Sequence, residues 1–392
     1  MDGLGDYDNQ GWFDPSALTA RERAWAATMA GHTEDSQAIV RAHANSTAAI
    51  SLVQPLLREE REEVLRLTAA TGATMAQGGG DRLREEAPDP VRTCFERDRD
   101  RILHSSSFRR LAGKTQVFVF PGDHQRTRLT HALEVAQVAR SVAQACRLNV
   151  ALVEAMAIGH DCGHGPGGHA SEDAFAPYVE GGYNHAVWGA DVSLRSLNLC
   201  RETLDGIRNH SWSRPAPLTP EGEVVSWADR IAYVCHDVED AVAAGVVRMD
   251  ELPSIVRQLC GVTRSDQLNA FIAAMVEATA TTGQIGMTPH FAQALAAFRL
   301  WNYERIYLRD ESRAQAGQVI ELLRGLVDHY VAHPDAMPAG FRSDSAGSPA
   351  LVHSAVTYVS GMTDRFACTQ ALTLLNWEPS RLPAGVDVLA LR

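Results

Sequence analysis

Apolar residues recur at three- and four-residue spacing along most of the chain, which is the period of an amphipathic α-helix. The clearest run extends from Leu133 to Val142 and resumes from Leu152 to Met156. Alternating runs of β-branched residues, which would indicate strands, are scarce from Thr93 onward. Two polar, proline-rich segments, His210 to Glu223 and His333 to Ser348, predict loops between helical blocks. The pattern therefore predicts an all-α helical bundle.

The first ninety or so positions predict two or three further helices. An apolar pattern from Leu18 to Met29 follows Asp14-Pro15, which suits a helix cap and first turn. A second pattern, from about Gln37 to Leu67, is interrupted by Pro55. We therefore expect helices at the amino terminus in addition to the main bundle.

A glycine run marks the boundary that we expect between two regions. Gly78-Gly79-Gly80 is followed by charged residues, Pro88 and Pro90, a composition typical of a linker. The expected organisation is an amino-terminal helical extension and linker over residues 1–92, whose role the sequence does not indicate, and a larger domain over residues 93–392.

Composition narrows the class of protein. The net charge of −12 disfavours sequence-independent coating of a nucleic-acid backbone. Seven scattered cysteines, none in a Cys-x-x-Cys motif, suit a reducing compartment. An acidic amino terminus, with no run of about 20 apolar residues, predicts a cytoplasmic protein without a membrane anchor.

The strongest chemical signal is the segment from His160 to His169, which holds three histidines and one aspartate around several glycines. His160 and Asp161 offer an imidazole nitrogen and a carboxylate oxygen to one divalent ion. The glycines permit the tight backbone path that brings His164 and His169 back to the same pocket. A purely structural role does not readily account for so many ligand-type residues in so short a segment.

Two positions elsewhere on helical stripes could complete a metal site. His131 shares an apolar stripe with valines, which places its imidazole on the inner face of a helix. Asp229 lies in an apolar helix, with Tyr233 and Asp237 following at four-residue steps on one face. Taken singly, His131 fits an ordinary core histidine and Asp229 fits a salt bridge with Arg230.

Taken together, these residues resemble a known signature. His131, His160-Asp161 and Asp229 resemble the H…HD…D motif of the HD superfamily, whose helical fold binds divalent metal through those side chains. More closely, the chain resembles the deoxyguanosine triphosphate triphosphohydrolase family, from about Phe95 to Ala367, with a metal-binding core at about residues 126–245. The segments that carry the resemblance are Phe95–Ile102, His104–Leu111, Lys114–Phe118, Gly122–His131, His160–His169 and Gly361–Ala367.

The resemblance implies hydrolysis of a deoxynucleoside triphosphate (dNTP) at the α-phosphorus, giving a deoxynucleoside and tripolyphosphate. It implies a divalent ion held by His131, His160, Asp161 and Asp229. Such a donor set accepts Mg²⁺ or Mn²⁺, and also Fe²⁺. A divalent ion polarises a phosphate oxygen and lowers the pKa of a water, which suits this reaction.

The same resemblance assigns roles to further residues. His164 matches the catalytic histidine, Glu172 the carboxylate that orients it, and His185 a second active-site histidine. The expected substrate contacts are Arg128 and His169 at phosphate, Tyr233 and Asp237 at the sugar, and Gln116 and Val117 along the sugar edge.

Other functions stay open at the level of the sequence. An HD phosphohydrolase could act on a monophosphate or a signalling nucleotide, and a regulator could bind nucleotide or DNA without turnover. A helical scaffold would require every ligand-type residue to be coincidental. The resemblance also implies a homo-oligomer, with a hexamer among its forms, and allosteric control by a dNTP or single-stranded DNA; base preference is not encoded in a visible motif.

Overall fold

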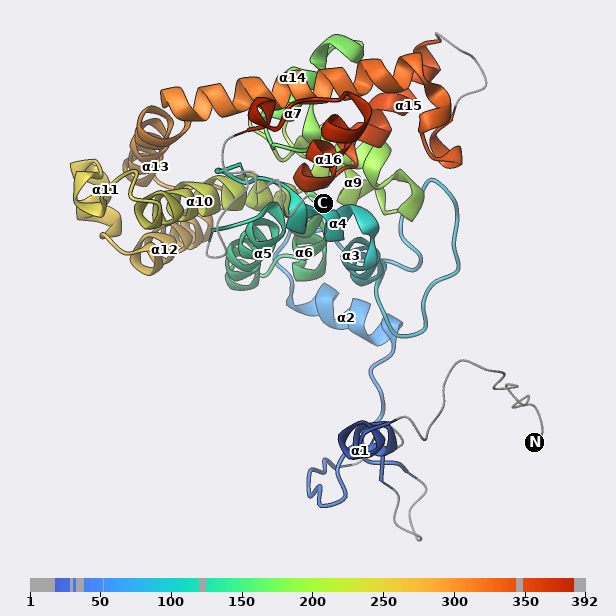
Figure 1. Cartoon of the computed structure of the whole chain (residues 1–392). Helices are drawn as coiled ribbons and strands as arrows, with labels where there is room; N and C mark the ends of the chain where they lie inside the picture. The colour runs from blue at the N-terminus through green and yellow to red at the C-terminus, as the bar shows by residue number, and fades with distance from the viewer. Residues whose placement is uncertain are drawn as a thin grey trace. The chain divides into compact units, whose positions relative to one another are not determined.

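The computed structural model describes residues 18–28, 31–32, 39–51, 53–119, 125–342 and 348–383, with residues 26–28 described through their backbone only. The chain divides into two compact units, Met1–Pro55 and Leu56–Arg392. The second unit contains all the residues that we expect to act on substrate (Figure 1).

Most of the described residues lie in helices, and β-pairing among them is limited to isolated bridges such as that of Thr115 with Thr127. The α-helices are α1 Ala20–Thr28, α2 Arg58–Thr68, α3 Cys94–His104, α4 Ser106–Arg110, α5 Arg128–Ala145, α6 Val150–Gly159, α7 Ala170–Phe175, α8 His185–Trp188, α9 Arg201–Asn209, α10 Pro220–Ala243, α11 Ser254–Cys260, α12 Arg264–Thr282, α13 Pro289–Asn302, α14 Asp310–Ala332, α15 Pro349–Ser360 and α16 Asp364–Leu374. Shorter 3-10 turns join several of them, and π-helical turns span Gly189–Ser193 and Tyr303–Tyr307. The all-α prediction is confirmed.

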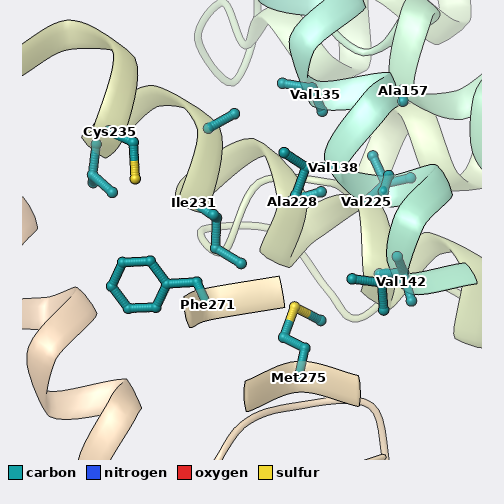
Figure 2. Packing of buried hydrophobic residues seen from close by; sticks show 14 of the residues in the cluster. Val135, Val138, Val142, Ala157, Val225, Ala228, Ile231, Cys235, Phe271 and Met275 are labelled. Carbon is teal, nitrogen blue, oxygen red and sulfur yellow. The ribbon is translucent and has the colours of Figure 1, made fainter. Parts of the chain in front are cut away.

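The main core forms where α5, α6, α10 and α12 pack together (Figure 2). Val135, Val138 and Val142 project from one face of α5, at the three- and four-residue spacing of an amphipathic helix, and all three are fully buried. Ile231 of α10 and Phe271 of α12 meet them in the same cluster. These contacts hold α5, α6 and α10 in fixed relation, and those three helices carry the expected metal ligands.

A second core surrounds α14, the long helix that packs against α7, α15 and α16 (Figure 1). Leu322, Leu323 and Leu326 of α14 are buried among apolar side chains of α15 and α16. Because α7 follows directly on the histidine-rich loop, this core supports one side of that loop.

The amino-terminal region differs from the sequence expectation. Within the expected helix from Gln37 to Pro55, residues 39–51 form turns, bends and irregular backbone, so that prediction is wrong there. Asn45, Ser46 and Thr47 explain the difference, since such side chains compete for backbone hydrogen bonds and favour turns. Positions Asp14, Pro15, Met29 and Gln37 lie outside the described residues.

The glycine-rich stretch expected as a linker packs against the helical body. Arg82 and Asp98 form a buried ion pair with an N–O distance of 2.6 Å, and Arg82 also donates to the carbonyl oxygen of Asn198. The predicted boundary near residue 92 therefore lies inside the second compact unit.

The two expected loops are shorter than predicted. Thr219 caps α10, its hydroxyl accepting from the Gly222 N–H at 3.1 Å, so the loop after α9 ends before Pro220. Short 3-10 turns at Pro334–Ala336 and Ala339–Phe341 occupy part of the second loop. Among the described helices, none combines the length and the apolar character needed to cross a bilayer.

Two leucines on α13 provide a test of the packing. Leu295 is 2% exposed and Leu300 is 60% exposed. Leu295→Ala should lower the free energy of unfolding by about 2–5 kcal/mol, because it leaves a cavity in the main core. Leu300→Ala, the matched control, should change it by less than about 0.5 kcal/mol. Urea titration followed by circular dichroism measures both, and equal effects would contradict the assignment of this helix face to the core.

Candidate active site

The site begins where α6 ends. This helix is almost wholly apolar and buried, and Asn149 caps its first turn by accepting from the Leu152 N–H at 3.3 Å. The helical backbone continues into His160, and the chain then turns back, with the His164 N–H donating to the Asp161 carbonyl oxygen at 3.0 Å. Both side chains of the His160-Asp161 pair are thereby buried inside the bundle.

The structure brings the four expected metal ligands together. His131 Nε2 lies 3.1 Å from Asp229 Oδ1, and His160 Nε2 lies 3.6 Å from the same oxygen. His160 Nε2 is also 3.3 Å from Asp161 Oδ1. The four residues come from α5, from the end of α6 and from α10, which the main core holds together.

The donor set fits a cation. His160 Nδ1 faces the Ala157 carbonyl oxygen at 2.6 Å, which directs Nε2 toward the cluster. His160 Nε2 is buried and has no hydrogen-bond partner in the part of the chain that the structure describes. An unpaired buried nitrogen beside two carboxylates is costly unless an ion or a proton occupies the space between them.

Electrostatics in the cluster point the same way. Burial lowers the pKa of His160, but the carboxylates of Asp161 and Asp229 outweigh burial and raise it to about 9. Burial raises the pKa of Asp161, but His160 and Arg128 hold it well below its usual range. Arg128 reaches Asp161 Oδ2 at 2.7 Å, whereas Oδ1 of the same carboxylate faces His160. The cluster favours positive charge at its centre.

Glycines make the loop between α6 and α7 sterically feasible. A Cβ on Gly163 would collide with the backbone of His185 and Gly189. Gly167 and Gly168 have φ angles of 71° and 64°, in the left-handed region that favours glycine. The tight path expected from the sequence is therefore present.

Three histidines gather beside the four-residue cluster. The rings of His164 and His185 stack with centroids 3.8 Å apart, and the ring of His169 lies 4.9 Å from that of His164. His164 is buried, whereas His169 is exposed to solvent. Both ring nitrogens of His164 lack a hydrogen-bond partner among the described residues. Burial, followed by the charge of Arg128, holds the pKa of His164 well below its usual value, so this imidazole is neutral.

Glu172 contacts a different histidine from the one expected. Its Oε1 accepts hydrogen bonds from the backbone N–H and from Nδ1 of His185. Burial raises the pKa of Glu172, but the hydrogen bond from His185 and that residue's charge lower it to about 2. Glu172 therefore pairs with His185 and not, as expected, with His164, whose ring nitrogens have no hydrogen-bond partner among the described residues.

The expected sugar contacts follow Asp229 along α10. The Tyr233 hydroxyl accepts from Arg299 Nε at 2.7 Å, and the Tyr307 hydroxyl donates to Asp237 Oδ2. Asp237 is buried, and its other oxygen, Oδ1, has no partner in the described part of the chain. Burial raises the pKa of Asp237 to about 7.

The expected contacts from the segment after α4 lie alongside the histidine-rich loop. Thr115 pairs with Thr127 just before α5, and the Thr115 carbonyl oxygen lies 3.0 Å from where a Cβ on Gly168 would be. Gln116 and Val117 follow immediately. Val117 packs against the main core, and Gln116 Oε1 is buried without a partner among the residues described.

Sequence reasoning missed His210, which the structure places at the histidine cluster, and two residues that contact Tyr233 and Asp237. His210 ends α9, with Nε2 3.2 Å from His185 Nε2 and its ring centroid 4.9 Å from that of His160. A signal was available, because Thr203, Ile207 and His210 follow one buried helical face. Arg299 and Tyr307 were missed as well; with Tyr303 they recur every four positions, which is a helical face.

Comparison with known proteins agrees with this geometry. The HD domain family matches residues 128–234, and the phosphohydrolase-associated domain family matches residues 285–372. A deoxyguanosinetriphosphate triphosphohydrolase-like protein from Caldanaerobacter subterraneus is 36% identical over 84% of this chain and 96% of its own length. Proteins with the same description from Clostridium perfringens and Desulfatibacillum aliphaticivorans are 37% and 38% identical, over 80% and 74% of this chain and 95% and 89% of their own lengths.

The HD domain match includes the whole histidine cluster. The chain is therefore an HD phosphohydrolase and belongs to the family of deoxyguanosinetriphosphate triphosphohydrolase-like proteins.

Proposed function

We propose that the protein hydrolyses deoxynucleoside triphosphates at the α-phosphorus, releasing the deoxynucleoside and tripolyphosphate. The observation that carries the proposal is the row formed by Asp229, Tyr233 and Asp237 on α10, which joins a metal-type cluster to an unpaired buried carboxylate oxygen. Cleavage of the bond between the sugar 5′-oxygen and the α-phosphorus requires a metal centre close to the residues that bind the sugar. The names of the relatives point to dGTP as the first substrate to test.

We assign His131, His160, Asp161 and Asp229 as the ligands of a divalent ion. Two imidazoles and two carboxylates suit Mn²⁺ or Fe²⁺, and Mg²⁺ is accepted through the carboxylates. When bound, the ion supplies Lewis acidity at a phosphate oxygen and lowers the pKa of a water. His160 would hold the ion in its neutral form, because the ion would take the place of the proton that the carboxylates of Asp161 and Asp229 favour.

The neighbouring histidines manage protons. Burial and Arg128 hold the pKa of His164 low, and its ring nitrogens have no hydrogen-bond partner among the described residues, so it can accept a proton from the attacking water. His185, held by Glu172 at Nδ1, can return a proton to the departing 5′-oxygen from Nε2. Glu172 thus fixes the orientation of the His185 ring by accepting a hydrogen bond from its Nδ1.

Arginines and the α10 row bind the rest of the nucleotide. Arg128 and Arg299 bring positive charge next to the cluster, suited to a triphosphate. Asp237 can accept from the sugar 3′-hydroxyl through its unpaired Oδ1, and Tyr233, one turn earlier on α10, can exclude a 2′-hydroxyl. This combination selects deoxyribose over ribose.

The first test is product analysis. Purified protein incubated with each dNTP and Mn²⁺ or Mg²⁺ should yield the deoxynucleoside and tripolyphosphate, resolved by anion-exchange chromatography. Orthophosphate or pyrophosphate as the first product would reject attack at the α-phosphorus. No turnover of any dNTP, with turnover of a monophosphate or signalling nucleotide, would place the chain elsewhere among HD phosphohydrolases.

His160→Ala should reduce the bound metal per chain, measured by elemental mass spectrometry, to background, because it removes a ligand with no substitute on the same element. His236→Gln is the matched control. His236 is equally buried, on α10, and lies outside the cluster. Metal retained by His160→Ala, or lost equally in both variants, would contradict the ligand assignment.

His164→Ala should lower kcat about 10²- to 10⁴-fold while the metal content stays that of the wild type, since it removes proton transfer but no ligand. Steady-state kinetics and metal analysis of the same preparation provide the check. Unchanged kcat would remove His164 from the mechanism.

Asp237→Asn should lower kcat/KM for dGTP about 10- to 100-fold, through loss of the carboxylate that accepts a hydrogen bond from the 3′-hydroxyl. The wild type should lose a similar factor on a 3′-deoxy analogue, and the variant should no longer distinguish the two substrates. Independent, additive losses would show that Asp237 and the 3′-hydroxyl do not interact.

A further inference from the structure

Asp364, the first residue of α16, reaches from the phosphohydrolase-associated segment into the candidate active site. It is 7% exposed. Its Oδ2 accepts from the Thr115 N–H at 2.8 Å and from the Thr115 hydroxyl at 2.5 Å, while its Oδ1 accepts from the Gly167 N–H at 2.8 Å. One carboxylate thus joins two segments that lie 197 and 249 residues away from it in sequence.

Both segments carry candidate site residues. Gly167 lies between His164 and His169, in the loop from α6 to α7. Thr115 directly precedes Gln116 and Val117. Asp364 therefore fixes the distance between the loop that carries the proton-handling histidine and the segment expected at the sugar edge.

A second buried side chain reinforces the same junction. Lys114, which is 3% exposed, donates from Nζ to the carbonyl oxygen of His164 and, at 2.9 Å, to that of Ser360 at the end of α15. The backbone of the expected catalytic histidine is therefore tied to the helix that precedes α16.

The loop that carries His164 also packs closely against α14 and Arg128. A Cβ on Gly167 would collide with Val319 of α14, so the loop backbone already packs closely on the second core. A Cβ on Gly168 would lie 2.6 Å from Nη2 of Arg128, whose guanidinium holds Asp161. A shift of the loop would thus reach Arg128 as well as His164.

We propose that Asp364 is a positioning residue for the active site. Without touching substrate, it holds the His164–His169 loop in register with the Gln116–Val117 segment, and so the second helical core sets the catalytic geometry of the first. The kinetic part rests on the proposed function; the structural part does not. A misplacement of about 1 Å in such a site costs about 100-fold in rate.

Asp364→Asn is the decisive variant because it keeps the shape of the side chain. One oxygen becomes an NH₂ donor that must face either Gly167 N–H or the Thr115 donors, so one of the two links breaks. We expect kcat to fall at least about tenfold with unchanged metal content. Amide hydrogen exchange should rise in peptides that cover residues 113–119 and 161–169.

Tyr330→Phe is the matched control. It removes a buried hydrogen bond at 2.9 Å, from Tyr330 on α14 to Gln370 on α16, in the same core but away from the loop. It should leave kcat, metal content and exchange in both peptides unchanged. Thr115→Val, which removes only the hydroxyl bond, should give a smaller change in the same direction and serves if Asp364→Asn does not fold.

The outcomes separate the alternatives. If Asp364→Asn lowers only the melting temperature, with kcat and exchange in both peptides as in the wild type, the residue is merely structural and the proposal is overturned. Equal changes in Tyr330→Phe would overturn it too. If the wild type hydrolyses no nucleotide, the proposed function fails, whereas the exchange measurements still decide whether Asp364 holds the two segments together.

Discussion

The site depends on keeping the Asp161 carboxylate charged inside an apolar bundle. One of its oxygens is paired with Arg128 and the other faces the imidazoles of His160 and His164. Such a group is tolerated in a core only when each oxygen has a partner. Arg128 and His131 lie one turn apart on α5, so the helix that neutralises the carboxylate also supplies a histidine to the cluster.

Much of this arrangement could be predicted from local sequence. The buried valine face of α5 was readable as a helical stripe, and it correctly placed His131 inward. Adjacent His160 and Asp161, followed by glycines, indicated a turn at a helix end, which the structure has. These features arise within one or two helical turns, where spacing and steric rules suffice.

Two features that sequence reasoning missed depend on contacts between distant segments, and a third depends on local polar residues. Whether Glu172 meets His164 or His185 is decided by the path of the chain between α7 and α8, which no periodicity encodes. The links of Asp364 to Gly167 and Thr115 span most of the chain, although the motif around Asp364 was recognised. In the amino-terminal region, polar residues near Ser46 outweighed a weak apolar pattern, and the expected helix did not form there.

The helix α10 fixes the distance between Asp229 and Asp237. Asp229 and Asp237 are two turns apart, about 12 Å along the axis, with Tyr233 midway between them. An insertion or deletion of one residue between them would turn the later side chains by about 100° around the helix and away from the pocket. Substitutions in this stretch leave that spacing intact, whereas any change in its length breaks the alignment of Asp229 with Asp237.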